Sequence, residues 1–377
     1  MQKIIGAMKP PFAAPHSAIL GAGLMGRLLA CALAQAGHRV SLYDAGNPNG
    51  DLSAARVAAA MLAPLAESAI TEPPVVRMGQ YGLHRWPQLL AQLATPVFFQ
   101  QEGTLILWHR QDAAEAARFT RQLEKTHASV TGLAQAQHMT PSQITQLEPA
   151  LAQRFAQGLY LPDEGQLDNR GLLQALLNEL TTLQVQTHWN TPRQPGDFLP
   201  GPHADADVQW LFDCRGMGGR AQLPTLRGVR GEVARVYAPE VKLKRPVRLI
   251  HPRYPLYIAP KPDDVYVIGA TEIESDDLSP VSVRSTLELL SAAYSVHSGF
   301  AEARILEFNT QVRPALPDNM PTIRFAAARS LQINGLYRHG FLIAPAMLDM
   351  VLQIVNQGYS ELAGQLDFKP ENLEAWA

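Results

Sequence analysis

The chain has 377 residues, more than the roughly 250–300 at which one hydrophobic core stops growing, so its length predicts two domains or one elaborated unit. Apolar residues make up 46% of the chain and charged residues 18%, which excludes a disordered protein. A net charge of −2 provides no positive excess for binding nucleic acid, and only two cysteines, Cys31 and Cys214, indicate a reducing, cytoplasmic location.

The sequence gives only weak indications of a membrane span, a secretion signal or a metal site. The best candidate for a membrane span, residues 341–355, is interrupted by a proline and an acidic residue, so no membrane association is expected. Prolines also interrupt residues 1–16, which are therefore interpreted as a loose N-terminal extension. No histidine or cysteine cluster has metal-ligand spacing, and His251 and His339 are interpreted as structural histidines.

The first periodic segments predict a strand, a helix and a second strand. The first strand covers residues 17–20, the helix covers 27–36, and the second strand covers 39–43. A glycine-rich turn joins the first strand to the helix. This order is typical of the opening of a dinucleotide-binding fold.

The glycines of that turn have the spacing that a bound dinucleotide requires. Gly21, Gly23 and Gly26 would in turn allow a tight turn, close approach to a pyrophosphate, and close packing of helix on strand. Asp44 ends the second strand, where this fold places the acid that binds a ribose diol, and it disfavours the 2′-phosphate of NADP. The pattern does not separate NAD from FAD, and an ordinary glycine-rich turn is the alternative.

The rest of the chain is expected to form helices and strands, then antiparallel hairpins, and then helices and a strand again. Expected after the first unit are helices over 74–93, 113–127 and 170–180, a helix cap at Thr140 and Pro141, and strands over 104–108 and 210–212. Antiparallel strands are expected over 232–237, 256–259 and 265–269. A helix near 287–294, a strand over 306–312 and a helix that starts at Pro345 complete the chain.

Four segments of the chain together resemble a known protein family. They are the alanine-rich residues 53–64, the hairpin and strand end at 260–271, Arg313-Pro314, and the C-terminal residues 337–345. In register with the glycine triplet, they resemble the D-amino-acid-oxidase superfamily of FAD proteins, most closely its glycine oxidase members. The resemblance covers nearly the whole chain.

The resemblance implies an α/β plus α+β protein, with a Rossmann-like FAD-binding domain interleaved with a mixed or antiparallel-sheet substrate domain. The motif order assigns residues 1–83, 150–222 and 308–377 to the FAD-binding domain. Residues 84–149 and 223–307 are assigned to the substrate domain. The substrate pocket is expected where the two domains meet.

By the same resemblance FAD is held noncovalently, because no cysteine lies near position 313. The loop around residues 59–61 would lie against the isoalloxazine ring, and backbone N–H groups of residues 338–342 would face its N1 and C2 carbonyl. The cofactor-binding residues implied are Gly21, Gly23, Gly26, Asp44, Ser53, Ala59, Ala60, Met61, Gly216, Arg338, His339, Gly340, Phe341 and Leu342.

Three residues are the catalytic candidates. Arg313 aligns with the arginine that binds the substrate carboxylate in the family, and a planar guanidinium suits that task because it can donate two parallel hydrogen bonds. Tyr257 aligns with a tyrosine of the same pocket, and Arg338 begins the segment that faces the flavin. The alternatives are a structural ion pair for Arg313 and an ordinary strand face for Tyr257.

The chain departs from the family pattern at positions that shape the pocket. Ala60 stands where the family has glycine, and residues 214–218 differ from the family's middle segment. Lys261 replaces the arginine of glycine oxidases, and His339 replaces an asparagine. These changes leave the FAD fold intact but leave the substrate undetermined.

Three functions are therefore considered. The first is an FAD-dependent oxidase of a small amine or amino acid, which transfers hydride to flavin with oxygen as the acceptor. The second is a glycine-oxidase-like flavoprotein that modifies a residue, such as tryptophan, of a partner protein during maturation of a tryptophylquinone cofactor. The third is a colourless NAD dehydrogenase. The sequence predicts no oligomeric state.

Overall fold

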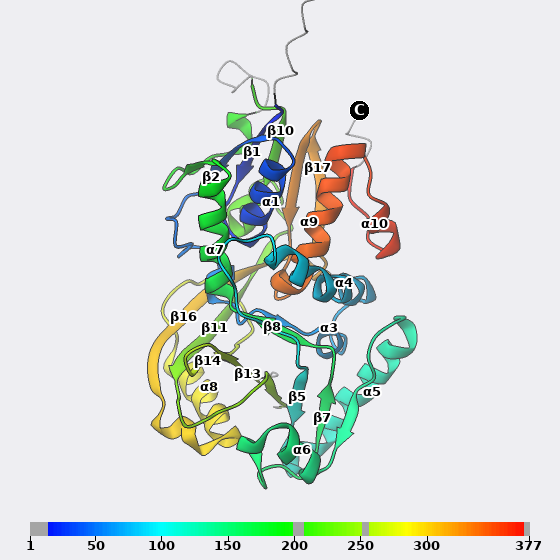
Figure 1. The fold of residues 1–377 in the computed structure, drawn as a ribbon, viewed down its shortest axis with the longest axis vertical. Helices are drawn as coiled ribbons and strands as arrows, with labels where there is room; N and C mark the ends of the chain where they lie inside the picture. The colour runs from blue at the N-terminus through cyan, green and yellow to red at the C-terminus, as the bar shows by residue number, and fades with distance from the viewer. Residues whose placement is uncertain (1–13, 199–206, 251–255, 373–377) are drawn as a thin grey trace, which may run out of the picture.

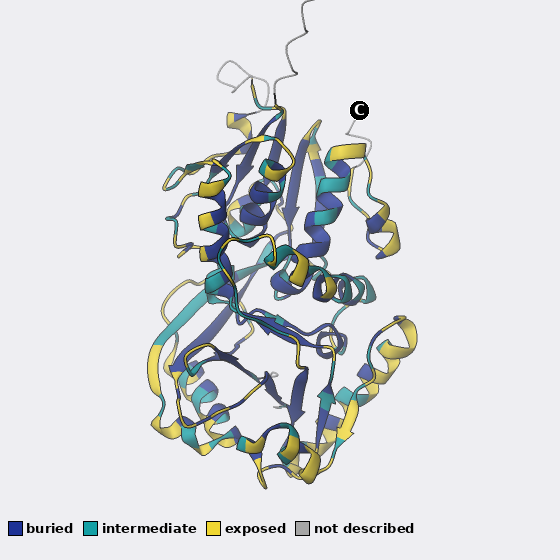
Figure 2. Cartoon of the chain, viewed as in Figure 1, coloured by how far each residue is buried: buried dark blue, intermediate teal, exposed yellow. Residues whose placement is uncertain are grey.

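The computed structural model describes residues 14–198, 207–250 and 256–372. His251 and most of the expected N-terminal extension lie outside these residues. Figure 1 shows an upper and a lower part, and the two long strands β11 (Arg227–Tyr237) and β16 (Arg304–Ala315) run from one part toward the other. Figure 2 shows that strands in both parts are largely buried, while exposed residues gather on outer helices such as α5 (Ala113–Ser129).

The first sheet contains, among the described residues, six strands in the order β17–β18–β10–β1–β2–β9. All neighbouring pairs are parallel except β17 with β18, which is the arrangement of a Rossmann-like sheet with one antiparallel edge. The strands are β1 (His16–Leu20), β2 (Arg39–Tyr43), β9 (Gln186–His188), β10 (Trp210–Asp213), β17 (Thr322–Ala327) and β18 (Ser330–Asn334).

Helices α1 (Leu24–Gln35), α7 (Asn169–Thr182) and α9 (Gly340–Gln357) join this sheet in one hydrophobic core. Strand β1 is buried at all five positions because it lies in the middle of the sheet. Helix α1 begins directly after the glycine turn and buries nine of its twelve residues. The core therefore fixes the glycine turn at the carboxyl end of β1, where doubly wound folds bind their ligands.

The second sheet forms the lower part of the molecule. Its strands follow the order β15–β11–β14–β13–β12–β5–β7–β6, and β16 pairs with β11 at the side. The remaining strands are β5 (Thr104–Leu107), β6 (Gln137–Met139), β7 (Gly158–Leu161), β12 (Val247–Leu249), β13 (Leu256–Lys261), β14 (Val265–Gly269) and β15 (Ile273–Glu274). Among the described strands of this sheet, only β5 and β12 form a parallel pair, so the sheet is mixed and mainly antiparallel.

A small three-stranded sheet, β3 (Met61–Leu62), β8 (Gly165–Leu167) and β4 (Phe99–Gln100), lies between the two parts. The other described helices are α2 (Ala54–Val57), α3 (Pro64–Glu67), α4 (Pro73–Leu90), α6 (Pro141–Leu147), α8 (Val283–Val296) and α10 (Glu361–Gln365). Short 3₁₀ turns cover Arg110–Asp112, Pro149–Leu151, Pro195–Asp197, Gly216–Gly219 and Ser298–Glu302.

The start of α9 differs from the sequence expectation. The helix begins at Gly340, and Pro345, expected as its first turn, is buried inside it. A proline at this position removes the hydrogen bond to the carbonyl of Phe341, four residues earlier. The indole Nε1 of Trp86 on α4 donates to that carbonyl instead, at 2.8 Å. The packing of α4 therefore compensates for the proline.

Helix α9 is long and apolar enough to cross a membrane by length and composition. However, 61% of its apolar window is buried inside the protein, and it packs against α1 and α4. The helix therefore serves this fold as a core helix.

The strand pairing bears on the expected division into domains, which stays a prediction. Strand β7 lies within residues 150–222, assigned to the FAD-binding domain, but it pairs with β5 in the second sheet. The expected boundary between residues 307 and 308 falls inside β16, which pairs with β11 along its whole length. Both differences arise because strand pairing between distant segments leaves no local signal in the sequence.

Candidate active site

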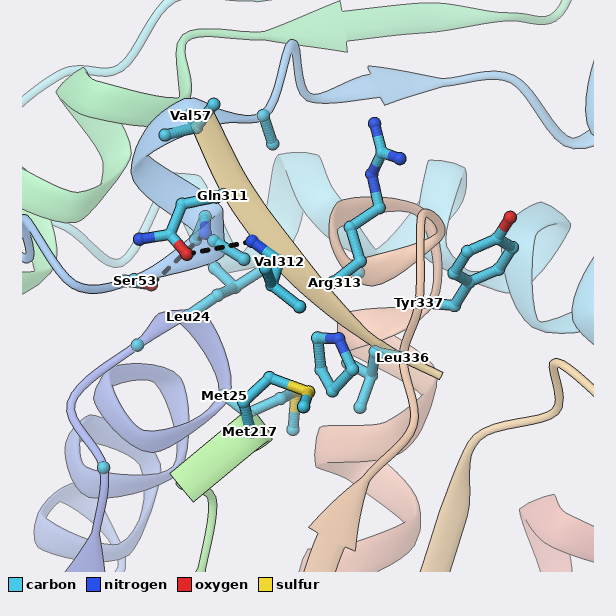
Figure 3. A pocket seen from close by; sticks show the side chains of 18 of the residues that line it. Leu24, Met25, Ser53, Val57, Met217, Gln311, Val312, Arg313, Leu336 and Tyr337 are labelled. Carbon is cyan, nitrogen blue, oxygen red and sulfur yellow. Dashed lines mark hydrogen bonds between the residues drawn. The ribbon is translucent and has the colours of Figure 1, made fainter. Parts of the chain in front are cut away.

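A cavity of about 550 Å³ lies where the glycine turn, the alanine-rich loop and the start of α9 meet the second sheet. It is lined by residues of β1, β2 and β18 and by residues of β11, β13 and β16. In Figure 3, Ser53 and Leu24 lie at one side of this pocket, and Arg313 and Tyr337 lie at the opposite side. Its volume falls within the roughly 300–1,000 Å³ of ligand sites in proteins.

The glycine turn and Asp44 form one end of the pocket. Gly21 has a φ of +91°, and a Cβ there would lie 2.7 Å from the carbonyl oxygen of Cys214, so only glycine fits. The carboxylate of Asp44 accepts hydrogen bonds from the backbone N–H of Ala22, at 2.5 Å, and of Gly46, at 2.7 Å. These bonds fix the acid at the end of β2, as binding of a ribose diol requires.

Gly26 does not line the pocket. A Cβ at this residue would lie 1.8 Å from the carbonyl oxygen of Gly21, so the glycine lets α1 pack directly on the turn. The sequence predicted this role in packing. Gly26 therefore supports a cofactor site without facing it.

Arg27 was missed by the sequence interpretation. Its buried guanidinium donates to the carbonyls of Ala22, Leu173 and Pro48 at 2.8, 2.7 and 2.6 Å. It thereby ties the glycine turn to α7 and to the loop that follows Asp44. Its signal in the sequence is a single charge on the otherwise apolar helix of residues 24–35.

The alanine-rich loop forms the wall between the two ends. Ser53 caps α2 by accepting a hydrogen bond from the N–H of Ala55 at 3.2 Å. Ala59, Ala60 and Met61 then follow along the pocket. Ala60 has a φ of +52°, a left-handed conformation, which accounts physically for the glycine that the resembled family has at this position.

The start of α9 supplies backbone donors to the same wall. No side chain of the described residues caps this helix, and the first N–H groups of any helix lack partners within it. Gly340, Phe341 and Leu342 are its first residues and line the pocket, as do Arg338 and His339 just before them. Together with the helix dipole, these N–H groups suit the negative charge that a flavin ring gains on reduction.

Arg313 on β16 lies at the opposite side of the pocket. Its Nη1 donates to the carbonyl of Thr271 at 3.2 Å, and it forms no ion pair with any carboxylate that the structure describes. A Cβ on Gly231 of the adjacent strand would lie 2.3 Å from its Nη2, so that glycine makes room for the guanidinium. The remaining donors of Arg313 are therefore available for an anion in the pocket.

Tyr257 on β13 lies near this guanidinium. Its hydroxyl would lie 2.8 Å from a Cβ on Gly269, so a second glycine makes room for the ring. Burial raises the pKa of Tyr257, although the charge of Arg313 opposes that effect. The phenol therefore remains protonated at neutral pH and can donate a hydrogen bond.

A group of buried charges continues from these residues. The carboxylate of Glu67 lies 2.5 Å from Nη2 of Arg248 and 3.0 Å from Nε of Arg338. Nη1 of Arg338 also lies 2.9 Å from Glu272, which accepts a hydrogen bond from the hydroxyl of Tyr337 at 2.5 Å. The guanidinium of Arg338 is thus committed to two carboxylates, whereas that of Arg313 is not.

The sequence interpretation missed Glu67, Arg248 and Glu272 as members of the site. Burial alone would raise the pKa of Glu67, but Arg338 and Arg248 hold it well below its usual range. Glu67 is a single charge inside an apolar stretch, and that is the signal that could have indicated it. Arg248 gives no such signal, because other basic residues surround it in the sequence.

His339 is buried beside this group. Its Nδ1 lies 3.5 Å from a carboxylate oxygen of Glu67. Burial lowers the pKa of His339 to about 4, so the ring is neutral at physiological pH. Within the part of the chain that the structure describes, no group of three histidines, cysteines or acids could hold a metal ion.

Comparison with known proteins assigns a family to this pocket. The family model described as FAD dependent oxidoreductase matches residues 16–352. A Rhizobium etli protein named thiamine biosynthesis oxidoreductase ThiO is 38% identical over 343 residues, which cover 90% of this chain and 97% of that protein.

Solved structures share the fold. Glycine oxidase from Geobacillus kaustophilus has a TM-score of 0.75 at 22% identity, with 91% of this chain and 95% of that chain covered. Iminodiacetate oxidase from Chelativorans has a TM-score of 0.77 at 20% identity, with 94% and 99% covered.

These matches confirm the resemblance seen in the sequence, the expected fold class and FAD as the cofactor, and they count against the NAD dehydrogenase hypothesis. The glycine turn, the fixed Asp44 and the donors at α9 are a donor set that fits FAD. The chain belongs to the FAD dependent oxidoreductase family.

Proposed function

We propose that this enzyme oxidises a small α-amino acid, with glycine as the first candidate, and that it does so for thiamine biosynthesis. The observation that carries the proposal is Arg313, a guanidinium in the pocket with no described acidic partner and with space made by Gly231. The named role of the Rhizobium etli relative supports the link to thiamine.

The residues of the pocket would bind and orient the substrate. Arg313 would donate two parallel hydrogen bonds to the carboxylate, and the hydroxyl of Tyr257 would donate a third. FAD, when bound, would supply the acceptor for the hydride that leaves the α-carbon, and the nitrogen lone pair would form the C=N bond of a protonated imine. No side chain needs to act as a base if the amine binds unprotonated, so the residues work chiefly by positioning.

The test is anaerobic mixing of the purified, FAD-loaded protein with glycine, sarcosine and D-alanine. We expect glycine to remove the flavin absorbance in a stopped-flow spectrometer, and oxygen to restore it with formation of peroxide. Reduction by dithionite but by none of the amines would contradict the proposal. That result would favour modification of a partner protein, as considered above.

We also propose a cytoplasmic location. Cys31 and Cys214 are free thiols, and burial raises the pKa of Cys31 to about 12, so it is unreactive. Free cysteines are typical of proteins kept in reducing compartments. Secretion of the active enzyme by its native host, detected by fractionation, would contradict this location.

A further inference from the structure

Lys261, at the end of β13, has an unusual environment for a lysine. The residue is only 6% exposed. Its Nζ lies 2.8 Å from the carbonyl oxygens of Ala59 and Leu167 and 3.0 Å from Oε1 of Gln166. An ammonium group has three N–H donors, and here each of them has one acceptor.

No carboxylate that the structure describes forms an ion pair with this ammonium. Burial therefore lowers the pKa of Lys261 to about 7, with Asp168 opposing this effect and Arg235 adding to it. A buried, unpaired ammonium costs free energy, which its three hydrogen bonds offset. Such an arrangement needs a reason beyond packing, because an apolar residue would fill the same space without that cost.

The three acceptors show what the lysine connects. Ala59 belongs to the loop that forms the pocket wall, while Gln166 and Leu167 belong to β8 behind it. The N–H of Leu167 also donates to the carbonyl of Ala60 at 3.1 Å. The carbonyls of two successive residues of the loop are therefore held from behind.

The loop needs this support at one residue. Ala60 is 4% exposed and has a φ of +52°. An alanine in the left-handed region is disfavoured, because its Cβ approaches the following carbonyl. Without the bond from Lys261 to the preceding carbonyl, the loop could relax toward a conformation with a negative φ.

We propose that Lys261 is a positioning residue for FAD: it holds residues 59–61 in the shape of the cofactor pocket through the carbonyl of Ala59, without touching the flavin. The proposal rests on FAD binding by this family and not on the identity of the substrate. Measurements of FAD affinity therefore test it whether or not glycine is oxidised.

The first experiment compares Lys261→Met with a matched control, Lys242→Met. Lys242 is an exposed lysine that pairs with Asp264 at 2.7 Å, away from the pocket. The dissociation constant for FAD is measured by fluorescence titration of each apoprotein, after circular dichroism has verified folding. We expect Lys261→Met to weaken FAD binding by about 10- to 100-fold, from the loss of charged hydrogen bonds. Lys242→Met should leave it unchanged.

The second experiment asks whether Lys261 acts through the conformation of Ala60. Glycine takes a positive φ without the cost that alanine has. Ala60→Gly should therefore recover at least roughly 5-fold of the FAD affinity lost in Lys261→Met, while changing the affinity of the unmodified protein much less. If Lys261 only stabilised the fold, Lys261→Met and Ala60→Gly would change the FAD affinity independently of each other.

Lys261→Arg keeps a cation with several donors and should bind FAD within about 3-fold of the unmodified protein. This variant and Ala60→Gly/Lys261→Met carry the test if Lys261→Met does not fold. FAD affinity of Lys261→Met equal to that of the unmodified protein would overturn the proposal. So would strictly additive effects of the two substitutions.

Discussion

Two arginines of the pocket differ in what their guanidinium groups contact. Arg338 is paired with Glu67 and Glu272, whereas the guanidinium of Arg313 forms no ion pair with a described residue and donates a hydrogen bond to the backbone carbonyl of Thr271. A substrate carboxylate would have to displace existing partners at Arg338 but not at Arg313. We therefore propose Arg313, and not the side chain of Arg338, as the residue that binds the substrate carboxylate.

This assignment predicts the effect of Arg313→Met. Loss of two charge-assisted hydrogen bonds, each worth about 1.5–3 kcal/mol, should lower kcat/KM for an amino acid by roughly 100-fold or more. Steady-state peroxide formation checks it. Arg304→Met, on the exposed end of the same strand, is the control and should keep normal activity. A normal kcat/KM in Arg313→Met would remove this residue from the site.

The pKa of His339 predicts how the free energy of unfolding depends on pH. Its folded-state pKa of about 4 lies below the ordinary value of 6.5. As the pH falls, His339 therefore takes up a proton at a higher pH in the unfolded chain than in the folded protein. The stabilisation that is present above pH 6.5 is lost between pH 6.5 and pH 4. The loss should reach about 3 kcal/mol. His339→Asn should flatten this part of a urea-unfolding profile against pH, and an unchanged profile would contradict the prediction.

These residues show what sequence patterns can predict about the site. The glycine turn, Asp44 and residues 338–342 are local motifs that the sequence could indicate, and all of them except Gly26 line the pocket. Their role in binding FAD stays a prediction. The partners of Arg338 could not be predicted, because Glu67 and Glu272 are distant from it in the chain and meet it only in the fold.

At the scale of elements, helix α1 packs directly on the glycine turn. The missing side chain of Gly26 allows the helix to approach the carbonyl of Gly21. The start of α1 thereby lies directly at the pocket. FAD binding at this end depends on that approach, because the N–H groups of a helix start act only over a short range.

Gly26→Ala should therefore move α1 away from β1. Overpacking at buried sites costs typically 1–3 kcal/mol and sometimes more, and we expect at least about 2 kcal/mol together with loss of bound FAD. Gly364→Ala is the matched control, because no described heavy atom beyond its chain neighbours and its own helix backbone lies within 4 Å of a Cβ there. Helix α10 should become slightly more stable, since alanine favours a helix more than glycine does. Chemical unfolding and the absorbance of bound flavin measure both variants. Retention of full flavin content in Gly26→Ala would contradict this account.

The elements themselves were largely predictable from periodicity. Strand β14 has the bounds that alternation predicted, and Thr140 caps α6 as expected. The predicted start of α9 at Pro345 was wrong. The helix accommodates this proline because the indole of Trp86 donates a hydrogen bond to the carbonyl that Pro345 leaves without a partner in the helix. A compensating contact between two helices cannot be seen in either helix alone.

At the scale of the whole molecule, the pocket is shared by the two large sheets. β1 and β2 line the end of the pocket at the glycine turn and Asp44, and β11, β13 and β16 line the opposite end. The motif order predicted this interleaving. It did not predict that β7 and β16 belong to the second sheet, because pairing between distant strands is decided by tertiary contacts.

A shared pocket predicts that FAD stabilises both parts together. Free FAD at 100 times its dissociation constant should add about 2.7 kcal/mol to the free energy of unfolding. In thermal unfolding, release of flavin fluorescence should coincide with the loss of secondary structure seen by circular dichroism. Flavin release that clearly precedes the loss of structure would show that one part unfolds alone.

The strand order of the first sheet also has a consequence for biosynthesis. β1 pairs with β10, which lies almost two hundred residues later in the chain. At about 5–20 residues per second, a ribosome needs on the order of 10–40 s to make that stretch. During this time the apolar β1 can pair on one side only, with β2. The nascent chain is therefore expected to need chaperone protection, and FAD can stabilise only a polypeptide whose translation has passed α9.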